Sequence, residues 1–210
     1  MAARIGALLG TLTLTVLTTL TAADGAVAES VGNTAPTTAP RGADFAATST
    51  RWRNTTYTVP CGGFSARPVT ATVRGGEGTA PGDRNWPSGY DLRVWTTTTG
   101  DLTGDGRPET AVLTLCAPWG ANYSMPDVLV FTRGNKPLGR LPVLPRAERT
   151  LAPEYDARVF TLANRQLVTR VGFYGLEDCH VCGPSKHVTL AWSWDGQHFV
   201  TRTPIAVPRR

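Results

Sequence analysis

The sequence predicts an all-β fold, an antiparallel meander of hairpins that forms a sandwich or a partly closed barrel. Three observations support this: short runs alternate between apolar and polar residues, Gly, Pro, Asn and Asp separate the runs, and no stretch combines helical periodicity with capping residues. The chain has 210 residues, of which 41% are hydrophobic and 18% charged. This length allows one sizeable core, and the composition excludes a disordered polyampholyte and a multispan membrane protein.

The beginning of the chain is expected to lie outside the folded domain. Residues 1–28 combine one cation, an apolar stretch and small residues up to Ala28, which is the pattern of a secretory signal cleaved near Ala28. Interspersed threonines make the apolar stretch too polar for a membrane span of ~20 apolar residues. Residues 29–50 are rich in Ala, Thr and Pro and predict a disordered, flexible linker. We therefore expect a secreted protein with a single β-rich domain over residues 51–210.

The strands of this domain are expected where β-branched and aromatic residues concentrate. Isolated strands are predicted at residues 55–59, 69–74, 92–98 and 110–115. Hairpins are predicted for residues 128–133 with 136–141, 157–162 with 166–173, and 187–194 with 197–201. Gly134-Asn135 and Asp195-Gly196 mark two of the turns, because these residues readily adopt positive φ.

The tryptophans divide into two groups by their sequence context. Trp192 and Trp194 share one parity with Val188 and Leu190, so they are expected to pack in the core, whereas His187 has the opposite parity and should face solvent. Less regular contexts surround the others, and one or more of them should be exposed: Trp52, Trp86, Trp95 and Trp119. Exposed tryptophans can stack on sugars or anchor a partner.

Residues 100–109 form the most informative segment. Oxygen-bearing side chains recur at alternate positions in its first half, two glycines allow a sharp backbone path, and a strand follows at once. The candidate metal ligands are the side chains of Asp101, Thr103, Asp105 and Glu109, and the backbone carbonyl of Arg107. Calcium is a hard cation that takes six to eight oxygen ligands, so this spacing predicts a calcium-binding loop. An Asp-Gly turn with its carboxylates in water is the alternative.

This segment resembles the calcium loop D-x-[ND]-x-D-G-x-x-[DE] of the FG-GAP and VCBS families. The resemblance covers a single copy, with Thr103 where Asn or Asp is usual, and implies that calcium is the cofactor. Val112 stands where an EF-hand has its final Glu, so the loop is not an EF-hand. The order of export signal, linker, acidic loop, late C-x-x-C and closing W-x-W-D-G also resembles small uncharacterised secreted proteins of high-GC bacteria.

The cysteines are expected to form disulfides, because exported proteins meet an oxidising environment. Of the possible pairings, Cys61 with Cys116 and Cys179 with Cys182 is the simplest. A zinc site using Cys179, Cys182 and His187 lacks a complete set of ligands. A redox dithiol at Cys179 and Cys182 lacks the helix N-terminus that lowers a thiol pKa.

No motif in the sequence commits the chain to a reaction, so enzymatic activity stays uncertain and a non-catalytic role is favoured. The net charge of +5 comes mainly from scattered arginines, which disfavours nucleic-acid binding. The sequence therefore predicts a secreted structural or interaction module for a cell-wall or extracellular partner. Two alternatives stay open: a secreted hydrolase with a site near Asp178, His180 and His187, or a carbohydrate- or cell-wall-binding module that uses exposed tryptophans.

Overall fold

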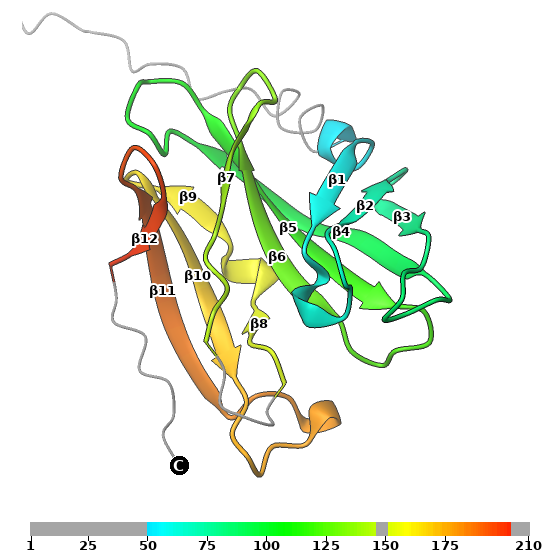
Figure 1. Cartoon of the computed structure of the whole chain (residues 1–210). Helices are drawn as coiled ribbons and strands as arrows, with labels where there is room; N and C mark the ends of the chain where they lie inside the picture. The colour runs from blue at the N-terminus through cyan, green and yellow to red at the C-terminus, as the bar shows by residue number, and fades with distance from the viewer. Residues whose placement is uncertain (1–49, 146–150, 203–210) are drawn as a thin grey trace, which may run out of the picture. The chain divides into compact units, whose positions relative to one another are not determined.

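The computed structural model describes residues 50–145 and 151–202 (Figure 1). Every described residue belongs to one compact unit of the chain. The predicted signal peptide and almost all of the predicted linker lie outside the described residues.

The described residues form antiparallel sheets, which confirms the all-β antiparallel class. A small sheet pairs β1 (Thr56–Val59) with β2 (Val69–Thr72). The large sheet has the order β3 (Glu77–Ala80), β4 (Tyr90–Gly100), β5 (Glu109–Pro118), β6 (Met125–Phe131) and β7 (Pro137–Arg140). The C-terminal sheet has the order β12 (Phe199–Thr201), β11 (Lys186–Trp194), β10 (Gln166–Phe173) and β8 (Glu154–Tyr155), and β9 (Thr161–Ala163) also pairs with β10. Short 3-10 turns are η1 (Cys61–Gly63), η2 (Ala157–Val159) and η3 (His180–Cys182).

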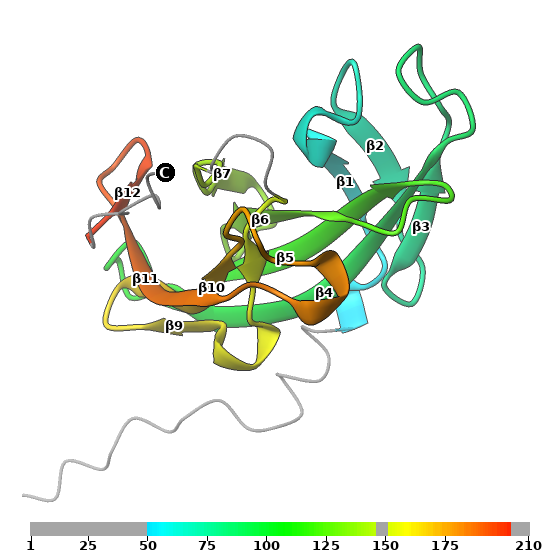
Figure 2. The same ribbon diagram turned by 90° about the horizontal axis from the view of Figure 1, so that it is seen from below.

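The large sheet is a middle layer with a hydrophobic core on each face. Leu113 of β5 packs in the core shared with the C-terminal sheet, whereas Val112 packs in the core shared with β1 and β2. Both are 0% exposed, as expected for a strand covered on both faces. Figures 1 and 2 show β1 and β2 at the β3 end of the large sheet and β10 and β11 on the other side of the domain. This layered packing corresponds to the sandwich, and no sheet among the described residues closes into a barrel.

The predicted C-terminal hairpin is present, but its loop is longer than expected. Trp194 pairs with Phe199, so the returning strand begins at Phe199 rather than at Gln197. Asp195 Oδ1 accepts hydrogen bonds from the backbone N–H of Gln197 at 2.8 Å and of His198 at 2.7 Å. The Asp195 side chain therefore closes a wider loop than the two-residue turn suggested by Asp-Gly.

The predicted strand over residues 157–162 is mostly wrong. Its first half is the turn η2, because Asp156 caps this turn by accepting a hydrogen bond from Arg158 N at 3.0 Å. A strand begins only at Thr161, and the chain then reverses through Asn164 and Arg165, whose φ angles are 51° and 59°. The hairpin was thus predicted correctly, but its first strand is much shorter.

Both predicted disulfides are confirmed. Cys61 is bonded to Cys116, which joins η1 to β5, and Cys179 is bonded to Cys182 in the segment before β11. All the cysteines are used, so neither the zinc site nor a free dithiol forms in this structure. Among the described residues, no helix has the length and hydropathy needed to cross a membrane.

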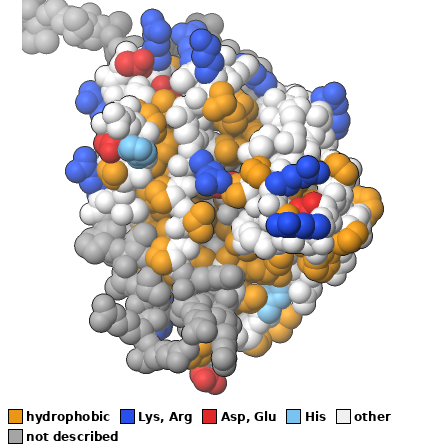
Figure 3. Space-filling view, in the orientation of Figure 1, with side chains coloured by type: hydrophobic (Ala, Val, Ile, Leu, Met, Phe, Trp, Pro, Cys, Tyr) orange, Lys and Arg blue, Asp and Glu red, His pale blue; other side chains and the backbone are white. Residues whose placement is uncertain are grey.

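Basic side chains occupy several places on the face drawn in Figure 3, with some beside one another at its upper edge and a pair next to acidic atoms at the right. Some are neutralised locally. Arg93 Nε lies 3.1 Å from Glu77 Oε1, and Arg158 Nε lies 3.0 Å from Asp156 Oδ1. Exposed ion pairs of this kind contribute little to stability.

Candidate functional site

The loop between β4 and β5 and the first residue of β5 contain the predicted calcium ligands. Asp101 accepts two backbone hydrogen bonds, from Gly104 N to Oδ1 at 2.6 Å and from Gly106 N to Oδ2 at 3.1 Å. Gly104 and Gly106 have φ angles of 81° and 77°, a region that residues with a Cβ rarely adopt. The two glycines therefore allow the loop to wind around the Asp101 carboxylate.

Glu109 anchors this loop from the start of β5. Its Oε2 accepts hydrogen bonds from Leu102 N at 2.8 Å and Thr103 N at 3.1 Å. Thr103 Oγ1 donates to Glu109 Oε1 at 3.5 Å. Glu109 is only 3% exposed, and Leu102, 1% exposed, packs into the core between the large and C-terminal sheets. The backbone N–H groups of the loop thus stabilise a buried carboxylate.

Each of the predicted carboxylate ligands accepts a hydrogen bond from a backbone N–H of the loop in this arrangement. Asp105 is exposed, and its Oδ1 accepts a hydrogen bond from Arg107 N at 2.8 Å. Arg165 lies against the loop, since a Cβ on Gly104 would lie 2.6 Å from Arg165 Cζ. Within the described residues, no three His, Cys, Asp or Glu side chains gather in a group that could hold a metal.

Asp178, His180 and His187, the residues considered for a hydrolase, lie just before β11 and at its start. Asp178 Oδ2 accepts hydrogen bonds from Gly175 N at 2.6 Å and Ser185 N at 2.9 Å, and these bonds lower the pKa of Asp178. Among the described residues, no hydrogen bond joins Asp178 to either histidine. Asp178 therefore holds the backbone of the segment before β11, while the two histidines line surface hollows.

A β-bulge in β4 presents an aromatic side chain to these hollows. The register between β4 and β5 shifts between Val94 and Thr96, which leaves Trp95 as the extra residue. Bulges of this kind re-aim side chains and are frequent beside functional sites. Trp95 is 46% exposed, whereas Val94 is 2% exposed.

Two adjoining hollows, which together we call the Trp95 cleft, meet at this tryptophan. They have volumes of about 390 and 550 Å³, and both are lined by Trp95, Glu154 and Tyr155. The first is also lined by Asn122, Tyr123 and His180, and the second by Asp156, Arg158, Arg170 and His187. The cleft therefore combines an exposed aromatic face with donors and acceptors from several strands.

The strand register places the polar groups of the second hollow in one row. Glu154 of β8 and His187 of β11 both pair with Gly172 of β10, so their side chains leave the same face of the sheet. The Tyr174 hydroxyl donates a hydrogen bond to Glu154 Oε1, and among the described residues Glu154 Oε2 has no partner. Burial of Tyr174, together with this bond, raises the pKa of Tyr174. Glu154 thus has an acceptor oxygen available to a ligand.

The other tryptophans confirm the predicted division. Trp192 is 0% exposed, and the centroid of its ring lies 6.2 Å from the centroid of the Tyr155 ring. Trp194 is partly buried against Phe199, with ring centroids 4.9 Å apart. Trp192 therefore belongs to the core, and Trp194 packs against it. Trp119, like Trp95, is 46% exposed, but it lines neither hollow of the cleft.

No protein-family model, curated protein or solved structure matches this chain. Function therefore has to be inferred from the geometry of its own sites.

Proposed function

We propose that this chain is an exported, non-catalytic domain that binds carbohydrate of the cell wall or the extracellular space in the Trp95 cleft. The observation that carries the proposal is the exposed Trp95 ring, presented by a bulge into a cleft with Glu154 and His187. The two disulfides support export, because such bonds persist in oxidising compartments.

The cleft matches the chemistry of a sugar ring. A pyranose has an apolar C–H face that packs on an aromatic ring and a rim of hydroxyl groups that need hydrogen-bond partners. Trp95 supplies the aromatic face. Glu154 Oε2 can accept from a hydroxyl, and Arg170 is exposed with no described residue accepting from its guanidinium, so it can donate. Charge-assisted hydrogen bonds of this kind are the stronger ones.

Trp95→Ala should weaken binding to polysaccharide strongly. The measurement is retention of the purified protein on insoluble peptidoglycan, cellulose and chitin, followed by titration on whichever polymer retains the wild type. We expect at least a tenfold loss for Trp95→Ala, because aromatic anchors in a concave site contribute most of the binding energy.

Trp119→Ala is the matched control, because Trp119 has the same 46% exposure and lies outside the cleft. It should bind as the wild type does. An equal loss in both variants, or no retention of the wild type on any polymer, would contradict the proposal. Release of soluble sugar by the wild type would replace binding with hydrolysis.

We propose in addition that calcium binds the loop between β4 and β5 and stabilises the domain. This proposal is supported by the alternating oxygen donors, by the positive φ angles of Gly104 and Gly106, and by the resemblance to FG-GAP and VCBS loops. When bound, calcium would be held by Asp101, Thr103, Asp105, the Arg107 carbonyl and Glu109. Neutralising the carboxylates would remove their mutual repulsion.

Calcium added to protein pretreated with chelator should raise the melting temperature by about 5 °C or more at ~100-fold saturation. Asp105→Ala should abolish this increase with little effect on the metal-free protein, because the Asp105 side chain is exposed and accepts one backbone hydrogen bond. Asp195→Ala is the control, since Asp195 caps a different loop. An unchanged wild-type melting temperature, measured by calorimetry, would leave the loop as a hydrogen-bonded turn without metal.

A further inference from the structure

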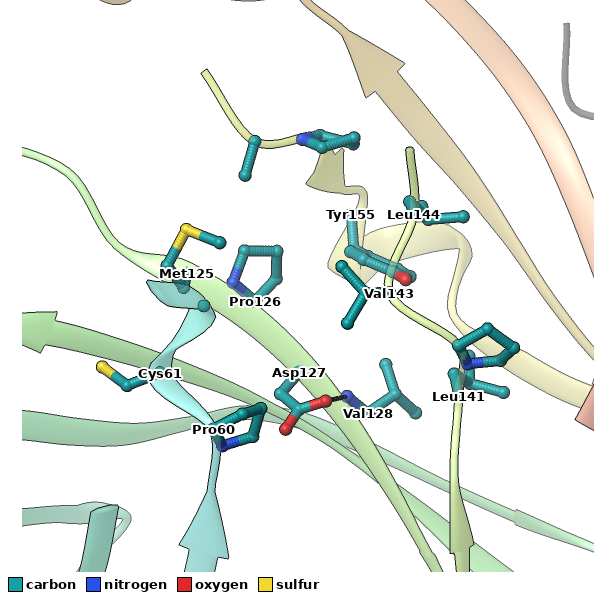
Figure 4. Close-up of a pocket in the computed structure, with 14 residues that line it drawn as sticks. Pro60, Cys61, Met125, Pro126, Asp127, Val128, Leu141, Val143, Leu144 and Tyr155 are labelled. Carbon is teal, nitrogen blue, oxygen red and sulfur yellow. Dashed lines mark hydrogen bonds between the residues drawn. The ribbon is translucent and has the colours of Figure 1, made fainter. Parts of the chain in front are cut away.

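A separate cavity of about 220 Å³, which we call the Asp127 pocket, lies between β6, β8 and the segments that follow β1 and β7 (Figure 4). Its wall is mainly apolar and includes Met125, Pro126, Leu141, Leu144 and the ring of Tyr155. It touches the Trp95 cleft through Pro126 and Tyr155, which line both.

Asp127 is the charged side chain in this apolar wall. Its side chain is 11% exposed, and its Oδ1 accepts a hydrogen bond from Val128 N at 3.1 Å, drawn in Figure 4. Among the described residues, the buried Oδ2 has no hydrogen-bond partner. Burial raises the pKa of Asp127 to about 6, and Arg140 lowers it by a smaller amount.

The polar and charged groups that face Asp127 do not form a hydrogen bond with its buried Oδ2. From β7, Arg140 Nε lies 3.9 Å from Asp127 Oδ1, and the Arg140 side chain is 42% exposed. From β8, Tyr155 is close enough for Asp127 to contribute to raising the Tyr155 pKa, but no hydrogen bond joins the two side chains. From β5, Thr114 donates to the backbone carbonyl of Asp127 rather than to its carboxylate, at 3.2 Å.

A buried carboxylate with an unpaired oxygen is unfavourable unless a donor reaches it. Titratable groups in such surroundings are candidates for functional sites. A bound ligand that donates a hydrogen bond would satisfy the unpaired oxygen. A ligand that fits this pocket needs a cationic group to pair with the carboxylate and a hydrocarbon part to pack against the apolar wall. Since a cavity of about 150 Å³ can hold benzene, a cavity of about 220 Å³ has space for a ring with one short polar arm.

We propose that the Asp127 pocket binds small organic amines, with the ammonium group paired to the Asp127 carboxylate and a hydrocarbon body of benzyl size against the apolar wall. This site is independent of the proposed carbohydrate function. Trp95 does not line it, so Trp95→Ala should leave amine binding unchanged, and failure of either proposal does not affect the other.

The test is titration calorimetry of the purified full chain with benzylamine and with its neutral analogue, benzyl alcohol, at pH 8. Benzylamine should bind at least tenfold more tightly than benzyl alcohol. Asp127→Asn keeps the side-chain shape and should weaken benzylamine binding at least tenfold while changing benzyl alcohol binding less than threefold. No benzylamine binding by the wild type, or equal binding by the Asn variant, would overturn the proposal.

Arg140→Gln distinguishes ligand binding from internal pairing. Arg140 is the one cation described near the carboxylate and would compete with an amine for it. Benzylamine affinity should therefore stay the same or rise in Arg140→Gln. A loss of affinity in this variant would contradict the proposal, because it would mean that Arg140 contributes to the site instead of competing for it.

Discussion

Asp127→Asn should change the free energy of unfolding, relative to wild type, by about 3 kcal/mol between pH 4 and pH 8. The pKa of Asp127 is about 6 in the fold and 3.8 in its unperturbed state, and this difference corresponds to roughly 3 kcal/mol of linked free energy. The measurement is urea unfolding of both proteins at a series of pH values, in the absence of amines.

The direction of this change in stability depends on whether the folded or the unfolded state binds the Asp127 proton more tightly. Because the folded pKa of Asp127 is raised, the fold favours the protonated carboxyl. This stabilising contribution is complete below pH 3.8 and is lost as the pH rises through about 6. The wild type should therefore lose stability relative to Asp127→Asn between pH 4 and pH 7, since the Asn variant has no charge to bury.

Asp156→Asn is a control for which the pH dependence of stability should have the opposite sign. Hydrogen bonds from the Arg158 side chain and backbone lower the pKa of Asp156, so its stabilising contribution is present above its unfolded pKa and is lost as the pH falls through its folded pKa. The Asp156 variant should therefore differ from wild type in stability at neutral pH and converge with it in acid.

Parallel pH profiles of stability for wild type and Asp127→Asn would contradict the prediction, and would show that Arg140 pairs with Asp127 in solution.

Some of the strands that the sequence predicted have side chains that contrast clearly between two faces. In β11, Leu190 and Trp192 are buried as their shared parity requires, whereas Val188, which has the same parity, is 36% exposed. The strands it missed have no such contrast. β3 contains a glycine and has one buried residue, Ala80, and β8 has only two residues, Glu154 and Tyr155. Both exist because neighbouring strands pair with them, and tertiary context of this kind is not visible in a local pattern.

The candidate sites were harder to predict than the fold, because each joins residues distant in sequence. Trp95 shares its parity with the polar residues Asp91 and Arg93, which was a usable sign of exposure. The strand pairings that bring Glu154 and His187 together have no such sign. The calcium prediction relied on the spacing of oxygen donors, on two glycines and on a resemblance to known calcium loops. None of these specifies whether carboxylates turn toward an ion or toward backbone N–H groups.

One feature of the sequence points to the Asp127 pocket, although the sequence alone did not identify a site there. Asp127 interrupts the apolar run of β6, MPDVLVF, where an ionised side chain is costly to bury. Its unpaired oxygen becomes evident only when β7 and β8 are placed around it. A charge inside an apolar strand therefore indicates where to look for a site, but it does not identify the ligand.

Cys61→Ala/Cys116→Ala should lower the free energy of unfolding by about 4 kcal/mol, because the disulfide closes a loop across 55 residues of the unfolded chain. Both cysteines are 1% exposed, so the variant also loses packing in the core beneath β1 and β2. Such a loss is a large part of the stability of a typical domain. Urea unfolding under non-reducing conditions measures it.

Cys179→Ala/Cys182→Ala is the matched control. These cysteines are three residues apart and exposed, so their loss should lower the free energy of unfolding by about 2 kcal/mol or less.

The two disulfides should also differ in which binding site depends on them. Cys61 lines the Asp127 pocket, whereas the Cys179–Cys182 loop carries His180 into the Trp95 cleft. Removing the second disulfide should weaken polysaccharide retention and leave benzylamine binding intact, and equal destabilisation by the two variants would contradict the loop-closure explanation.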